Sequence, residues 1–263
     1  MNKLYEKSEL WFALTWIIIY ILGCNFGDYM STAIGIEKWI TLIVLFIITV
    51  TMLFWISKNK LWAKYGLVFP KQKAKYYLFY IPLLVLISTN VWFGLNKNTA
   101  LTSFESFSFI ASMVLVGIVE ELIFRGFLFK AMEKSNLTSA IIVSSLTFGI
   151  GHIINLLNGS TDLVAGLCQI VYASAVGFLF VVIFYKSQSL LPCIVTHSLV
   201  NALSIFCNMT NLQTIITSIV ITLVAVGYAI FIAKVAPKTE EYEEEVETVT
   251  TTTVTTTRIR KDK

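Results

Sequence analysis

Ionisable and amide side chains interrupt three of the most apolar stretches of this sequence. A charged side chain at bilayer depth is costly unless it is paired or faces water, so each one is by default a candidate for function. Both histidines of the chain are among these residues. The set comprises Glu120, Glu121 and Arg125 in one stretch, His152 in the next, and His197 with Asn201 in a third.

The two adjacent glutamates differ in the neighbours that a helix gives them. Glu121 and Arg125 are four residues apart, so an ion pair can form on one helix face. Glu120 has Phe124 at that spacing and is rotated by about 100° from Glu121. We therefore expect Glu121 and Arg125 to form a structural pair, and Glu120 to point into a cavity as the unpartnered acid–base group.

Counting along the helices places the candidate residues at similar depth. Glu120 and His152 lie on consecutive stretches joined by a turn near Lys134, and their depths differ by about 5 Å at about 1.5 Å per residue. His197 and Asn201 are one helical turn apart on the same face. Four glycines that flank these residues would let the helices approach closely: Gly117, Gly126, Gly149 and Gly151.

This set of side chains suits hydrolysis without a protein nucleophile. A carboxylate and a neutral imidazole can share a water, remove its proton and direct it at a carbonyl carbon. A second imidazole and an amide can donate hydrogen bonds to the oxyanion that develops. The apolar stretches hold neither a serine with partners that would activate it nor the zinc motif with two histidines four residues apart.

The composition is that of a membrane protein and excludes a nucleic-acid-binding one. Of 263 residues, 56% are hydrophobic and 14% charged, and the mean hydropathy is +0.76, whereas ordinary soluble domains have roughly 25% charged residues. In lipid each apolar run must form an α-helix, because its backbone amides find no water. The predicted fold is an all-α bundle of about eight transmembrane helices, at residues 10–27, 39–56, 76–95, 106–129, 137–157, 163–185, 190–206 and 212–233.

The distribution of basic residues predicts the orientation in the membrane. Assigning the breaks alternately to the two sides places nearly all Lys and Arg on one side and leaves Lys38 and Lys97 on the other. Cytoplasmic loops carry such an excess, so both termini are predicted to be cytoplasmic. Residues 1–236 form the predicted membrane domain, with a motif core at 106–206. Residues 237–263, rich in Glu and Thr, form a predicted disordered tail.

Three motifs in this order resemble the signature of the CAAX prenyl protease and bacteriocin-processing family, also called the CPBP or Abi family. Each motif is weak alone, but three in order on separate apolar runs form a strong signal. They are EExxxR at Glu120, Glu121 and Arg125, FxxxH at Phe148 and His152, and HxxxN at His197 and Asn201.

The resemblance implies a glutamate-dependent intramembrane protease. The residues matching Glu120 and His152 would activate water, and those matching His197 and Asn201 would stabilise the oxyanion. The expected partners are the lipid bilayer and a membrane-associated or amphipathic peptide or protein substrate, with no nucleic acid and no cofactor. Bacterial members are linked to bacteriocin maturation, self-immunity and peptide-pheromone processing. The small size and brief loops of this chain are like those members, so a prenylated substrate is not favoured.

Three alternatives remain open. A zinc ion held by Glu120, His152 and His197 would satisfy simple ligand arithmetic. A transporter or proton relay could also use buried Glu and His, although the sequence shows no internal repeat and no interrupted helix. The chain could instead be a non-catalytic immunity or scaffold protein, in which the same side chains form a satisfied polar network.

Overall fold

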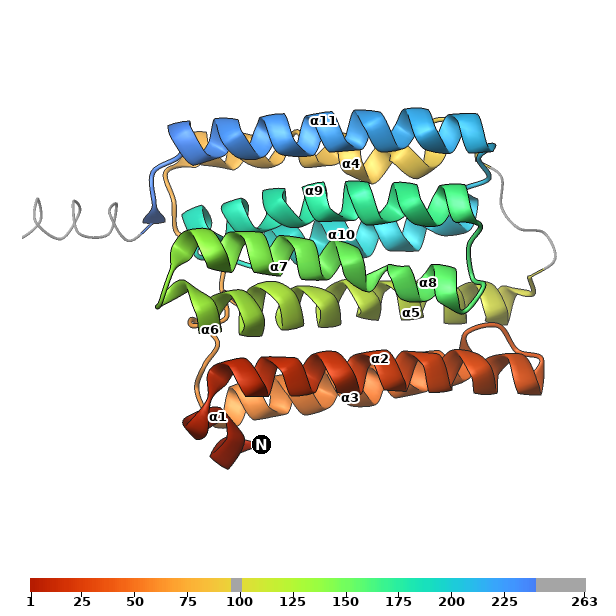
Figure 1. The fold of residues 1–263 in the computed structure, drawn as a ribbon, viewed down its shortest axis with the longest axis horizontal. Coiled ribbons are helices and arrows are strands. Elements are labelled where there is room, and N and C mark those ends of the chain that lie inside the picture. The colour runs from red at the N-terminus through yellow and green to blue at the C-terminus, as the bar shows by residue number, and fades with distance from the viewer. Residues whose placement is uncertain (96–100, 240–263) are drawn as a thin grey trace, which may run out of the picture.

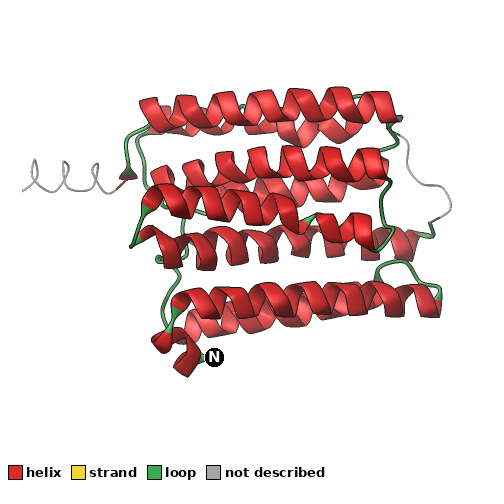
Figure 2. Cartoon of the chain, in the orientation of Figure 1, coloured by secondary structure: helices red, strands yellow, loops and turns green. Residues whose placement is uncertain are grey.

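The computed structural model describes residues 1–95 and 101–239, and every regular element in those ranges is helical (Figure 2). This confirms the predicted all-α fold, while residues 240–263 of the predicted tail lie outside the described residues. The α-helices are α1 (Asn2–Lys7), α2 (Glu9–Ile34), α3 (Trp39–Lys58), α4 (Leu83–Ser88), α5 (Ser103–Glu121), α6 (Lys130–Glu133), α7 (Leu137–Gly151), α8 (Ile153–Leu157), α9 (Leu163–Ser187), α10 (Leu191–Leu203) and α11 (Asn211–Val235).

Seven segments of the described chain are long and apolar enough to cross a membrane. The remaining predicted span, at residues 190–206, is shorter, because the apolar helical segment Leu191–Phe206 has fewer than 18 residues. At about 1.5 Å per residue it reaches about 24 Å. The seven long segments are Glu9–Ile34, Trp39–Lys58, Ala74–Val91, Ser103–Glu133, Leu137–Leu157, Leu163–Ser187 and Asn211–Val235.

Three of these spans are not single α-helices: Ser103–Glu133 contains a π-helix, and two others are divided. Residues 74–91 run as a 3₁₀ helix, α4 and a second 3₁₀ turn, with the change at Pro82, which has no N–H to donate. The span Leu137–Leu157 divides into α7 and α8 at His152, directly after two glycines of low helix propensity, Gly149 and Gly151. The expectation that no span is interrupted is therefore wrong.

The helices run side by side along the long axis of the molecule (Figure 1). α2 and α3 lie at one edge of the array, and α4 and α11 lie at the other. Between them, α9 packs against α7 and α11, and α5 packs against α3 and α10. The three helices that carry the sequence motifs, α5, α7 and α10, are therefore interior members of the bundle.

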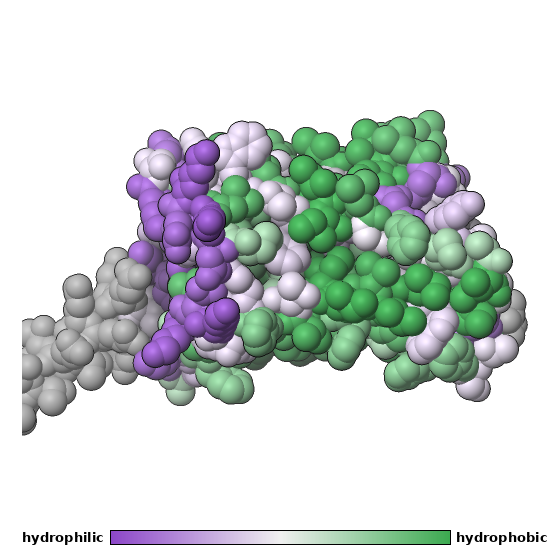
Figure 3. Space-filling model, turned by 90° about the horizontal axis from the view of Figure 1, so that it is seen from below, coloured by the Kyte–Doolittle hydropathy of each residue, from purple (hydrophilic) through white to green (hydrophobic). Residues whose placement is uncertain are grey.

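The bundle has an apolar outer surface and a polar end. Large apolar side chains are exposed along α2 and α3, among them Trp11, Leu22 and Phe54. On this face, apolar side chains cover the middle of the molecule, and hydrophilic ones gather at the end where the N-terminus lies (Figure 3). The C-terminal end of α11 lies at the same end (Figure 1). A large exposed apolar surface marks contact with lipid, and the chain is a multi-pass membrane protein whose orientation stays a prediction.

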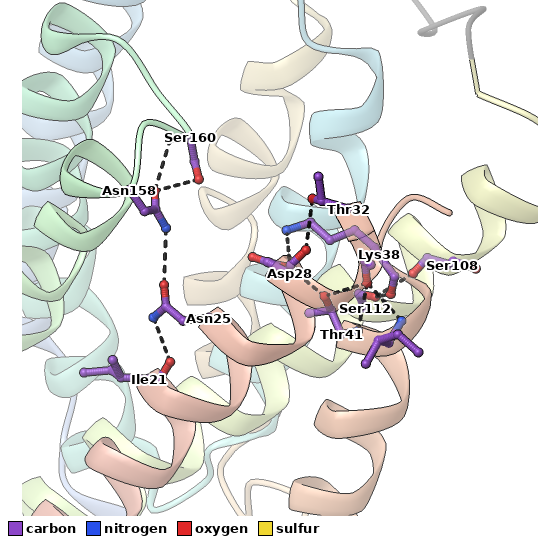
Figure 4. Close-up of polar contacts among 12 residues, drawn as sticks. Ile21, Asn25, Asp28, Thr32, Lys38, Thr41, Ser108, Ser112, Asn158 and Ser160 are labelled. Carbon is purple, nitrogen blue, oxygen red and sulfur yellow. Dashed lines mark hydrogen bonds and ion pairs between the residues drawn. The ribbon is translucent and has the colours of Figure 1, made fainter. Parts of the chain in front are cut away.

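Polar contacts fix the turn between α2 and α3 (Figure 4). Asp28 accepts hydrogen bonds from Lys38 Nζ at 2.8 Å and from Thr41 Oγ1 at 2.6 Å. Ser31 Oγ accepts from the Thr41 amide at 3.3 Å. This bond satisfies an amide in the first turn of α3, whose N-cap residue Lys38 makes no side-chain capping bond. Ser112 Oγ of α5 donates to the Lys38 carbonyl at 3.3 Å. The α2–α3 hairpin is thereby tied to the helix that carries the paired glutamates.

Candidate active site

The helix that carries the paired glutamates widens directly after them. α5 ends at Glu121, and a π-helix continues it over Leu122–Phe129, all of whose residues are buried. The Ser144 hydroxyl on α7 donates to the Phe124 carbonyl at 2.8 Å. In a π-turn a carbonyl no longer accepts from the amide four residues further on, so another donor can take its place. The sequence predicted a regular helix here, because an apolar run does not distinguish the two forms. π-helical turns occur frequently at functional sites.

Glu121 and Arg125 form the buried ion pair that their spacing predicts. Arg125 Nη1 donates to Glu121 Oε1 at 3.0 Å, and neither side chain is exposed. The guanidinium lies 4.1 Å above the Phe148 ring, a cation–π arrangement that adds to the pair. Gly177 of α9 leaves room for it, since a Cβ at that position would lie 3.1 Å from Arg125 Nη2. The pair thus joins the π-helix to α7 and α9.

His197 lies between the two carboxylates. Its Nδ1 is 2.8 Å from Glu121 Oε1, and its Nε2 is 3.4 Å from Glu120 Oε2. An ionised carboxylate only accepts, so the contact at Nδ1 fixes a proton on that nitrogen. The neighbouring Ser198 lies against Gly117 of α5, and its hydroxyl donates to the Val114 carbonyl at 3.0 Å. This close approach of α5 and α10 is what brings the imidazole to the glutamates.

Glu120 has a partner that the sequence did not predict. The Tyr20 hydroxyl of α2 donates to Glu120 Oε1 at 2.7 Å. The expectation that Glu120 is unpartnered is therefore wrong: it accepts from Tyr20 and contacts His197. The only trace of Tyr20 in the sequence is its place in an aromatic series with Phe12 and Trp16, each four residues apart.

His152 and Phe148 occupy the interrupted span. His152 forms the turn between α7 and α8, and its Nδ1 lies 3.0 Å from the Phe148 carbonyl oxygen. The Phe148 ring packs edge-to-face against both imidazoles, with centroids 5.1 Å from His152 and 5.5 Å from His197. Phe148 therefore contacts both histidines, and the supporting role expected of it stays a prediction.

A small cavity of about 80 Å³ brings most of the predicted residues together. Phe148, His152, His197 and Asn201 line it. Glu120 is not among the lining residues, but it contacts His197. The remaining walls come from α4, the 3₁₀ turn after it, α9, α10 and α11. They are largely apolar: Leu86, Thr89, Gln169, Tyr172, Ala173, Val176, Phe180, Val200 and Ile221. This lining favours apolar groups and offers a few polar side chains to a reacting group.

The described residues include no group of three or more His, Cys, Asp or Glu side chains placed to hold a metal ion. The zinc alternative needs Glu120, His152 and His197 around one ion. Glu120 Oε2 and His197 Nε2 lie 3.4 Å apart, but His152 does not join them in such a group. The described residues therefore do not bring that ligand set together.

The comparison with family models gives a match to part of the chain. The model for type II CAAX prenyl endopeptidase Rce1-like proteins matches residues 102–203. This segment, less than half of the chain, is therefore similar to the CPBP/Abi family. No curated protein and no solved structure matches the chain. The CPBP match contains the three motifs and the helices α5 to α10, and it leaves out α2, where Tyr20 lies.

Proposed function

We propose that this protein is an intramembrane endopeptidase that uses Glu120 as a general base to hydrolyse a membrane-associated or amphipathic peptide. The observation that supports this most is the contact between Glu120 Oε2 and His197 Nε2, at 3.4 Å, beside a cavity that His152, His197 and Asn201 line. The match of residues 102–203 to the Rce1-like family model supports a membrane protease of the CAAX type. The apolar walls of the cavity favour an apolar substrate segment.

The proposed reaction begins with a water held between Glu120 and His152. Its oxygen attacks the peptide carbonyl carbon while one O–H bond breaks and the proton passes to Glu120. The carbonyl π electrons move to oxygen, and the resulting oxyanion accepts hydrogen bonds from His197 and Asn201. When the intermediate collapses, the C–N bond breaks and the leaving amine takes the proton from Glu120, which restores the carboxylate.

Glu121 and Arg125 serve this reaction through His197. The carboxylate of Glu121 accepts from Nδ1, so the imidazole is oriented with Nε2 toward Glu120 and the cavity. A His197 ring protonated at both nitrogens lies between two carboxylates and can donate from Nε2 to the oxyanion. Arg125 balances part of the negative charge from the other side of Glu121.

The test is cleavage of a quenched hydrophobic peptide library by purified protein in proteoliposomes. Glu120→Gln should lower cleavage by at least about 10²-fold, because an amide cannot take the proton. Its carbonyl can still accept from Tyr20, so folding should be preserved. The matched control is Glu133→Gln, which changes a carboxylate paired with Lys130 at the polar end of the same span.

Each result of this assay has a distinct meaning. Products made by the wild type and by Glu133→Gln, but not by Glu120→Gln, would support the proposal if a chelator leaves them unchanged. Chelator-sensitive products would instead favour the zinc alternative. Equal cleavage by Glu120→Gln, or a wild type that cleaves no peptide, would contradict the proposed base.

One observation favours a second candidate, a transporter or proton relay. The interruption of the span at His152 resembles the discontinuous helices that line transport sites. Proton flux in the same proteoliposomes, loaded with a pH-sensitive dye, tests it. Flux abolished by Glu120→Gln, together with no cleavage, would favour this candidate over the protease.

A further inference from the structure

The hydroxyl of Tyr20 contacts the proposed base from outside the segment that matches the family model. It donates to Glu120 Oε1 at 2.7 Å, across 100 positions of sequence. The other carboxylate oxygen, Oε2, is buried and has no hydrogen-bond partner among the described residues. His197 Nε2, 3.4 Å away, is its ion-pair neighbour. The two oxygens of Glu120 are therefore unequal, one anchored and one left for chemistry.

An aromatic face holds α2 against the glutamate helix on one side of Tyr20. Phe12 and Trp16 are buried two turns and one turn before it, respectively, on the same helix face. Both pack on Phe127 of the π-helix, with ring centroids 5.1 Å and 6.5 Å away. These contacts fix the rotation of α2 about its axis, and so direct Tyr20 toward Glu120.

Polar contacts hold α2 on the other side of Tyr20. The Asn158 amide of the α8–α9 turn donates to Asn25 Oδ1 at 3.4 Å (Figure 4). One turn further on, Asp28 accepts from Lys38 and Thr41, as described above. Tyr20 thus lies between two sets of contacts that fix α2, and its hydroxyl is placed by the fold rather than by its own flexibility.

We propose that Tyr20 is a positioning residue for Glu120, anchoring Oε1 so that Oε2 faces His197, which lines the cavity. This inference rests on the proposed function for its catalytic meaning. A carboxylate held by one oxygen cannot rotate the reactive oxygen away, and such orientation governs how often the base and water meet in a productive geometry. Without the hydroxyl, Glu120 keeps its charge and its burial but loses its fixed direction.

The test is Tyr20→Phe, which removes only the hydroxyl and keeps the ring. We expect kcat to fall by about 10- to 100-fold in the peptide assay, while KM stays unchanged because no substrate contact is lost. The matched control is Tyr29→Phe, the same change on the same helix at a side chain that is 72% exposed, and it should behave as the wild type. A Tyr20→Phe variant with wild-type kcat would overturn the inference, as would a rise in KM at constant kcat.

A second measurement does not depend on turnover. The difference between the infrared absorption spectra of the wild type and Glu120→Gln isolates the carboxyl bands of Glu120. These bands should shift when the same difference is taken in the Tyr20→Phe background, and not in the Tyr29→Phe background. Unshifted bands would overturn the anchoring contact. Shifted bands in a protein that cleaves no peptide would uphold the anchoring contact and contradict only the proposed protease function.

Discussion

At the scale of single residues, one oxygen of Glu121 accepts two hydrogen bonds, from Arg125 Nη1 at 3.0 Å and His197 Nδ1 at 2.8 Å. Glu121→Gln leaves Arg125 as a buried charge without its counter-ion, which costs about 3–5 kcal/mol. We expect this variant to unfold at a markedly lower temperature, and to cleave more slowly because His197 loses its anionic anchor. Thermal unfolding in detergent and the peptide assay measure the two effects.

The control for this prediction is Glu133→Gln. Glu133 accepts from Lys130 at 2.9 Å and its side chain is partly exposed, so loss of the pair should cost about 1 kcal/mol or less. Equal melting temperatures for Glu121→Gln and Glu133→Gln would show that the buried pair does not have the structural role given to it.

The sequence predicts contacts within one helix and misses those between helices. The Glu121–Arg125 pair follows from a spacing of four residues on one element. The partners of Glu120 do not, because they depend on how α2 and α10 pack against α5. Tyr20 is one of 11 tyrosines, and nothing in its neighbourhood marks it except an aromatic series that any buried helix could carry. Counting along the helices predicted that Glu120 lies near His152, whereas the histidine within ion-pair distance of Glu120 is His197.

At the scale of the elements, the approach of α5 to α10 sets the geometry of the site. A Cβ on Gly117 would lie 2.6 Å from the Ser198 amide nitrogen and 2.8 Å from its Cα. Backbone atoms cannot move aside cheaply, so Gly117→Ala must displace α10 and with it His197. We expect a loss of about 1–3 kcal/mol in the free energy of unfolding and up to about a 100-fold loss in kcat. Melting temperature and peptide cleavage measure both.

Gly227→Ala on α11 is the matched control for this substitution. A Cβ there meets no atom within 4 Å, and alanine has the higher helix propensity. This variant should be as active and as stable as the wild type, or slightly more stable. If Gly117→Ala is equally harmless, the α5–α10 contact does not position His197.

Hydrophobicity predicted where the helices lie but not how they deviate from regularity. The eight apolar runs correspond to seven long spans and one short segment, because lipid imposes a helix on every such run. The π-helix Leu122–Phe129 is accompanied by a tertiary contact, Ser144 on the Phe124 carbonyl, and the turn at His152 follows two glycines within its own span. Of the four glycines expected at close contacts, Gly117 and Gly149 meet backbone atoms of a neighbouring helix. Gly126 and Gly151 have space around them.

At the scale of the whole molecule, polar interactions gather at the end that holds the N-terminus. Glu9 accepts from Lys64 Nζ at 2.7 Å and from Lys134 Nζ at 2.8 Å. This joins α2 to the segment after α3 and to the α6–α7 turn. The hydrogen bond to Glu9 raises the pKa of Lys134 above its ordinary value, so this end keeps its positive charge across the physiological range. Excess positive charge at one end is the feature that retains loops in the cytoplasm.

We therefore expect the end with Lys134 to be cytoplasmic. Two exposed serines in turns at opposite ends of the bundle provide matched probes: Ser135 between α6 and α7, and Ser160 between α8 and α9 (Figure 1). In a background without Cys24, Cys168, Cys193 and Cys207, a membrane-impermeant maleimide added to intact cells should label Ser160→Cys and spare Ser135→Cys. Inside-out vesicles should give the reverse. The opposite pattern in intact cells would show that the orientation is inverted. The turns that hold the probes lie beyond the two ends of the span Leu137–Leu157. Labelling of both positions from one side would therefore contradict the membrane-spanning arrangement of α7.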